Sequence, residues 1–290
     1  MDFTLKTYKS LLQKLKTRGF SFYTFSGYLQ INQTNEPKQW IILRHDVDLM
    51  PENSLQTAKI EHSLGIRSTY FFRIIPETFK PDIIQQIADL GHEIGYHYED
   101  LTLAVETHAF VPQKRSGSGG RASLNDNRAS SNITPCAYQL FKTHLEQLRQ
   151  YVPVKTICMH GSPKSRYDSK DIWKEYDYRE LGIIGEPYFD INFDEVLYLT
   201  DTGRRWDGWK VSLRDKVPQQ ETWKKAGLVF QSTKDIIQAA EQNNLPNKIM
   251  ITTHPQRWTD RPWPWMKELV WQGVKNVVKG ILVVRGQKSD

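Results

Sequence analysis

The stretch QWIILRHDVDLMPENSLQTAKIEHSLGIRSTYFFRII, residues 39–75, places two strand patterns on either side of a helix pattern. The apolar run over 39–48 predicts a buried strand, and residues 51–66, which begin with a proline, predict the helix that follows it. Residues 67–75 predict the next strand. A strand–helix–strand unit of this length indicates two parallel strands joined by a crossover helix.

The same alternation continues along the chain. Further strands are expected at 92–98, 154–161, 182–187, 196–203, 228–231 and 248–255. Helices are expected at 81–91, 136–150, 170–176, 232–244 and 264–279. The pattern therefore predicts an α/β fold with about seven parallel strands, which suits a barrel at least as well as an open sheet.

The domain organisation follows from two stretches that differ from the rest. Residues 1–37 begin with an amphipathic, lysine-rich helix pattern, so we expect an N-terminal helical extension packed on a barrel formed by 38–290. Residues 111–135 are rich in serine, glycine, asparagine and arginine and have few apolar side chains. We expect a mobile loop there, inside the barrel domain, because helix and strand patterns resume on both sides of it.

Composition excludes several classes of protein. The 290 residues are 39% apolar and 25% charged, as in ordinary globular proteins, and the net charge of +6 is not gathered into one basic run. No nucleic-acid motif is present, and the two cysteines have neither metal-site nor disulfide-framework spacing. No apolar stretch approaches the ~18 residues of a membrane span, and no signal peptide is recognisable, so we expect a cytoplasmic protein. No feature indicates an oligomeric state.

Acidic residues and histidines follow four of the expected strands at the point where each ends. The residues concerned are Asp46, Asp48, His97, His160 and His254. One histidine at a strand end is ordinarily a capping or surface residue, and the chain has eight histidines. Because the carboxyl ends of parallel barrel strands meet at one face, however, these side chains are expected to converge on a shared site.

Three of these strand ends resemble motifs of the polysaccharide deacetylase superfamily, the NodB-homology fold that includes family-four carbohydrate esterases. The matching segments are RHDVD (44–48), GHEIGYH (91–97) and ITTH (251–254). The resemblance implies a distorted (β/α) barrel, a carbohydrate substrate and a divalent metal, for which we expect zinc. It also implies that Asp46 is the catalytic base and His254 the general acid, and that Asp48 and His97 are metal ligands.

One ligand of the family pattern is missing. The second motif of the family continues to another histidine, and Leu101 stands at that position here. His92 is no substitute, because five residues before His97 it faces the opposite side of the strand. The replacement could be His160, Glu99, Asp100, water or nothing. We predict His160, because it ends another strand and would keep an Asp–His–His set suited to zinc.

A three-ligand metal with an open position suits amide hydrolysis. Together with the resemblance, which implies the carbohydrate, the residues lead us to expect a metal-dependent hydrolase that removes an acyl group, expected to be N-acetyl, from a carbohydrate. Two alternatives stay open: a carbohydrate-binding pseudoenzyme that lost its metal, and a metal-free amidohydrolase acting on a small amide.

The expected substrate-binding residues are Arg44, Arg204 and Trp206. Arg204 and Trp206 belong to TDTGRRWDG, residues 200–208, where aromatic faces and arginines suit a sugar ring with an anionic group. The alternative is an edge loop with an Asp–Arg pair and a packed tryptophan. For Arg44, pairing with a carboxylate in the strand is an equally good interpretation.

Overall fold

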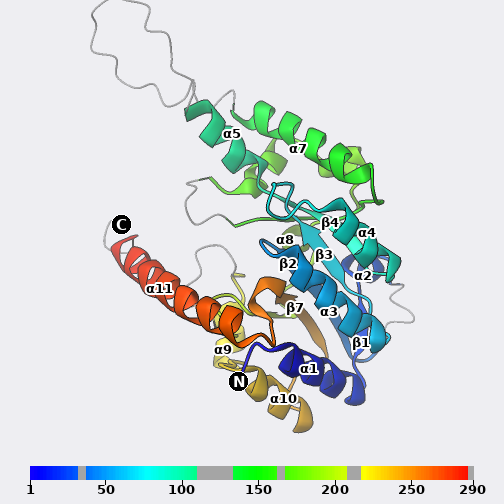
Figure 1. Cartoon of the computed structure of the whole chain (residues 1–290), viewed down its shortest axis with the longest axis vertical. Helices are drawn as coiled ribbons and strands as arrows, with labels where there is room; N and C mark the ends of the chain where they lie inside the picture. Colours follow the sequence, from blue (N-terminus) through cyan, green and yellow to red (C-terminus); the bar gives the residue numbers. More distant parts are fainter. Residues whose placement is uncertain (32–36, 110–132, 162–166, 208–216, 287–290) are drawn as a thin grey trace, which may run out of the picture.

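The computed structural model describes residues 1–31, 37–109, 133–161, 167–207 and 217–286 (Figure 1). Its centre is a curled sheet of seven strands in the order β5-β4-β3-β2-β7-β6, with β1 paired to the first half of β2. The strands are β1 (Ser21–Tyr23), β2 (Trp40–Val47), β3 (Thr69–Phe72), β4 (Glu93–Tyr98), β5 (Ile157–Met159), β6 (Leu197–Thr200) and β7 (Lys248–Thr253). Every strand pair is parallel. The predicted α/β fold with seven parallel strands is confirmed, as a half-barrel in which no described pairing joins β5 to β6.

Helices connect the strands, and several of them pack against the sheet (Figure 1). The α-helices are α1 (Leu5–Thr17), α2 (Phe25–Leu29), α3 (Pro51–Ser63), α4 (Pro81–Asp89), α5 (Asp100–Ala109), α7 (Ile133–Arg149), α8 (Pro187–Asp190), α9 (Gln220–Lys225), α10 (Thr233–Glu241) and α11 (Pro262–Gly286). Short 3-10 helices are η2 (Ser169–Lys174), η3 (Tyr178–Leu181) and η5 (Pro255–Arg257). None of the helices in the described ranges is long and apolar enough to span a membrane.

Two expected strands are wrong. Residues 182–187 contribute only an isolated bridge at Gly185, because Pro187 begins helix α8 and cannot extend a strand. Residues 228–231 form no strand; Phe230 is buried in the core instead, which accounts for the apolar pattern. In both segments a short apolar run reflects burial and not pairing.

The first 31 residues contribute two helices, α1 and α2, and one strand, β1, to the domain. Leu11, Leu12 and Leu15 of α1 pack in one apolar cluster with Ile236 of α10. Strand β1 pairs with β2, so this segment extends the sheet as well as covering it. The loop expected at 111–135 lies outside the described residues up to position 132, and α7 begins at Ile133.

Alternation along β2 decides which side chains face the inside of the curled sheet. Ile41 and Leu43 pack beneath α1 and α10, whereas Ile42 packs with residues of other strands on the opposite face. Arg44 and Asp46 share the parity of Ile42, so they point to the inner face. The inner face is therefore where polar groups of β2 meet those of neighbouring strands.

Candidate active site

The predicted site residues do converge at the carboxyl ends of the strands. Asp46 and His97 lie near the ends of β2 and β4, and three more residues directly follow β2, β5 and β7. Those three are Asp48, His160 and His254. Strand order explains the convergence, because β5, β4, β3, β2 and β7 are consecutive neighbours in one parallel sheet.

Asp48 is the centre of the cluster. Its Oδ1 lies 3.5 Å from Nε2 of His97 and 3.6 Å from Nε2 of His160, and its Oδ2 lies 3.8 Å from Nε2 of His254. Oδ1 is buried without a hydrogen-bond partner. Burial alone would raise the pKa of Asp48, but the three histidines hold that pKa well below its usual range. A buried, ionised oxygen is thus directed toward two imidazole nitrogens.

The other ring nitrogens of the two histidines are already engaged. Nδ1 of His97 lies 2.9 Å from the carbonyl oxygen of Cys158, and Nδ1 of His160 lies 2.9 Å from Oε2 of Glu99. Arg73 in turn donates to Oε1 of Glu99 from Nε at 2.7 Å. These contacts place a proton on each Nδ1 and leave each Nε2 free to bind a metal, an arrangement typical of metal-ligating histidines.

The donor set fits a divalent metal. Tetrahedral zinc with bonds of about 2.0–2.1 Å holds its ligand atoms about 3.3 Å apart, close to the separations around Asp48 Oδ1. One oxygen and two imidazole nitrogens also suit zinc. The geometry therefore brings together Asp48, His97 and His160 as a group able to hold a metal ion.

The rival ligands have other partners. Glu99 is occupied by His160 and Arg73, whereas Asp100 is fully buried and contacts His144 and Tyr96. The side chain of Leu101 packs in an apolar cluster on α5 and α7, away from the strand ends. His92 faces the opposite side from His97, as predicted, and lies 3.0 Å from the carbonyl oxygen of Ala58.

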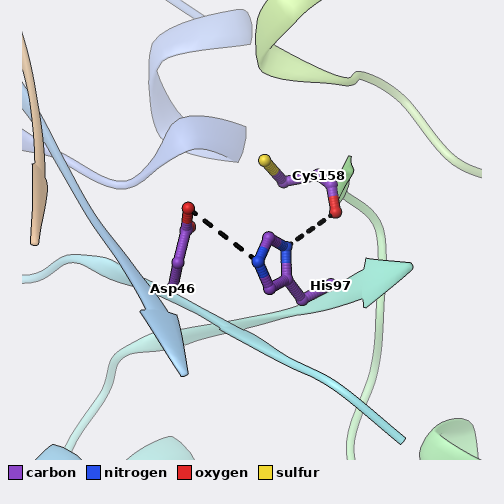
Figure 2. Close-up of side chains that lie close together, drawn as sticks. All are labelled: Asp46, His97 and Cys158. Atoms are coloured by element: carbon purple, nitrogen blue, oxygen red, sulfur yellow. Dashed lines mark hydrogen bonds and ion pairs between the residues drawn. The ribbon is translucent and has the colours of Figure 1, made fainter. Parts of the chain in front are cut away.

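A second cluster shares His97 but suits a metal less well. Asp46, His97 and Cys158 lie close together, with His97 between the carboxylate and the Cys158 carbonyl (Figure 2). Burial raises the pKa of the Cys158 thiol well above its usual value, and Arg44 contacts its Sγ. A protonated thiol beside a guanidinium cation is a poor site for another cation.

Asp46 lies beside the metal-binding group with one of its carboxylate oxygens unpartnered. Its Oδ2 lies 3.3 Å from Nη2 of Arg44 and 3.9 Å from Nε2 of His97, and its Oδ1 is buried without a hydrogen-bond partner. Nε of Arg44 donates to Thr252 at 2.6 Å. Arg44 thus holds one oxygen of Asp46 and leaves the other free to accept a proton.

His254 is held by a residue that the sequence reasoning missed. Asp201, directly after β6, accepts from Nδ1 of His254 at 2.6 Å, from Arg257 at 2.6 Å and from Nε1 of Trp258 at 2.7 Å. Nη1 of Arg257 also lies 2.7 Å from Nδ1 of His254, but Asp201 is the anionic acceptor between them, so we place the Nδ1 proton toward Asp201. Burial would raise the pKa of Asp201, but Arg257 and His254 lower it.

The expected substrate-binding side chains are packed into the protein. Arg44 is fully buried, and Trp206 is 2% exposed, with its Nε1 donating to Thr233. Arg204 lies over the ring of Trp265 and donates to that residue's carbonyl oxygen at 2.9 Å. Arg205 pairs with Asp207. The stretch 200–207 thus has the Asp–Arg pair and packed tryptophan of the alternative interpretation, and all three residues expected to bind substrate, Arg44, Arg204 and Trp206, are buried.

No family model matches the chain, and no curated protein matches it. Several solved structures resemble its fold. They include IcaB from Ammonifex degensii (12% identity, TM-score 0.37, 92% of this chain and 88% of that chain). They also include a family 4 carbohydrate esterase from Bacillus anthracis (11%, TM-score 0.35, 93% and 86%) and BA3943, a CE4 family pseudoenzyme from the same organism (13%, TM-score 0.37, 84% and 62%). The chain spans less than two thirds of BA3943. These likenesses are distant, and the side chains of the site are what indicate the chemistry.

Proposed function

We propose that this chain is a metal-dependent hydrolase that removes an acyl group, N-acetyl in the first instance, from a carbohydrate. The observation that carries the proposal is the buried Oδ1 of Asp48, which has no hydrogen-bond partner and lies 3.5 Å from Nε2 of His97 and 3.6 Å from Nε2 of His160. Each of these imidazole rings is held in place by a hydrogen bond at its Nδ1. The carbohydrate is proposed from the resemblance of the RHDVD, GHEIGYH and ITTH segments to polysaccharide deacetylase motifs.

Asp48, His97 and His160 would hold the metal. A divalent ion bound there would act as a Lewis acid that polarises the amide carbonyl and activates water. The side chains of Asp48 and His160 are 20% and 17% exposed to solvent, whereas the side chain of His97 is only 3% exposed. A substrate would therefore approach from the side of Asp48 and His160.

Asp46 and His254 would divide the proton transfers between them. The free Oδ1 of Asp46 would accept a proton from the attacking water, while Arg44 keeps Oδ2 in place. Nε2 of His254 would hold a proton and give it to the departing amine. Asp201, which accepts from Nδ1 of His254, would stabilise the charged imidazolium and keep Nε2 toward the site.

Acetate release tests this function. Protein stripped with a chelator and reloaded with zinc should release acetate from at least one member of a panel of N-acetyl sugars, nucleotide sugars and N-acetylated glycans. The stripped protein and the Asp48→Asn variant should not. Binding of a glycan without metal or turnover would instead identify a pseudoenzyme, and activity that survives chelation would identify a metal-free amidohydrolase.

A further inference from the structure

Helix α11 presents an apolar face to solvent. Six large apolar residues in its described part are between 45% and 74% exposed: Trp263, Met266, Leu269, Val270, Trp271 and Val274. Their spacing of three or four residues places most of them on one side of the helix. Isolated exposed apolar residues need no explanation, but large apolar residues gathered on one side of a helix are typical of an interaction surface.

The opposite side of α11 packs against the rest of the protein, so the apolar face points to solvent. Nε1 of Trp265 donates to the carbonyl oxygen of Asp2 at 2.7 Å, and Arg204 contacts both the ring and the carbonyl oxygen of Trp265. Gln272, seven residues after Trp265 and so on the same side, is buried. The far end of α11 lies away from the sheet (Figure 1).

Charge indicates what covers the face. Lys267 is exposed beside the apolar residues, and Nζ of Lys275 lies 5.2 Å from the ring centre of Trp271. Glu268 is half-buried and acts electrostatically on Arg204, on the attached side. The two described charges that reach the apolar face, Lys267 and Lys275, are thus positive, as is the chain, at +6. A second copy would bring like charges together, whereas an anionic surface would complement them.

We infer that the exposed face of α11 lies in the surface of a lipid bilayer that contains anionic lipid. Tryptophans with lysines at the flanks are typical of helices that lie in the membrane interface. Because α11 begins at Pro262, eight residues after His254, this contact would hold the strand-end site near the same surface. The inference does not depend on the proposed catalytic function.

Vesicle co-sedimentation tests the inference. The protein should bind vesicles of phosphatidylcholine with one quarter phosphatidylserine, bind phosphatidylcholine alone much more weakly, and dissociate as salt is raised. Trp263→Ser with Trp271→Ser should weaken binding at least about tenfold. Lys267→Gln with Lys275→Gln should weaken it by about thirtyfold, from ~1 kcal/mol per lysine. The control is Phe189→Ser, which removes a side chain 50% exposed on α8 and should change nothing.

Two results would overturn the inference. One is failure of the wild-type protein to bind either vesicle. The other is a stable dimer in light scattering that the tryptophan pair variant dissolves, since a second copy would then cover the face. The lysine variants alter only side chains that are exposed or half-buried, so we expect them to fold normally. They therefore test the inference even if the tryptophan variants fold poorly.

Discussion

Replacing Glu99 with glutamine should weaken metal binding without abolishing it. Glu99 lies 2.9 Å from Nδ1 of His160 through one oxygen and accepts from Arg73 at 2.7 and 2.6 Å through the other. Burial alone would raise the pKa of Glu99, but His160 and Arg73 lower it, so the carboxylate is charged at neutral pH. A glutamine offers one acceptor oxygen and must give up either His160 or Arg73.

The size of the effect follows from the role of this contact. Loss of a group that orients a metal ligand costs about 10–100-fold in metal affinity, or about 1.4–2.7 kcal/mol. We expect about tenfold for Glu99→Gln and about a hundredfold for Glu99→Ala, which also removes the contact to Nδ1. Zinc affinity is measured by competition with a chromophoric chelator. Glu146→Gln is the matched control, because Glu146 is exposed and its ion pair in the described chain is with Arg149, far from the site.

The test is sharpened by a double-mutant cycle. In a His160→Ala background Glu99→Gln should have no further effect, because its only route to the metal has been removed. The reasoning is refuted if Glu99→Gln alone loses as much zinc affinity as His160→Ala, which would make Glu99 a ligand. It is equally refuted if Glu99→Gln changes nothing.

Three further predictions concern residues around the site. Asp46→Asn should lower acetate release by about 10²–10⁴-fold and leave the zinc content unchanged; loss of zinc would mean that Asp46 is a ligand. Asp201→Asn should also keep zinc and lower kcat by about 10²-fold or more, since Nδ1 of His254 loses its anionic acceptor, and an unchanged kcat would contradict the role given to Asp201. Burial raises the pKa of Glu186 to about 7, so its contribution to stability is full at low pH and is lost as pH rises through 7. Denaturant unfolding should therefore show wild type losing about 3 kcal/mol more than Glu186→Gln between pH 4.5 and pH 8, and equal losses would contradict this.

Much of the site could be predicted from the sequence, because parallel topology links position in a strand to position in space. Once residues such as His97, His160 and His254 are assigned to strand ends, their convergence needs no further information. The same criterion could have found Asp201, which also directly follows a strand. Its role depends on a contact with the end of the neighbouring strand β7, and that adjacency is set by sheet order, which the sequence alone does not reveal.

The substrate-binding predictions depended on residue type, which does not determine burial. Trp206 has the composition of a sugar platform, but its ring packs against Phe3 and Trp258. Arg44 has the charge of a ligand-binding residue, but strand parity turns it to the inner face, where it contacts Asp46 and Cys158. Whether an aromatic or charged side chain is exposed is decided by packing between segments far apart in the chain.

Zinc stoichiometry of chelator-stripped, zinc-reloaded protein tests the central claim most directly. Elemental analysis should find one zinc per chain in the wild type and in Cys158→Ala, and far less than one in His160→Ala and His97→Ala. The folded state of each variant is checked by its thermal unfolding. Full occupancy in His160→Ala, or loss of zinc in Cys158→Ala with His160→Ala unaffected, would contradict a metal centre formed by Asp48, His97 and His160.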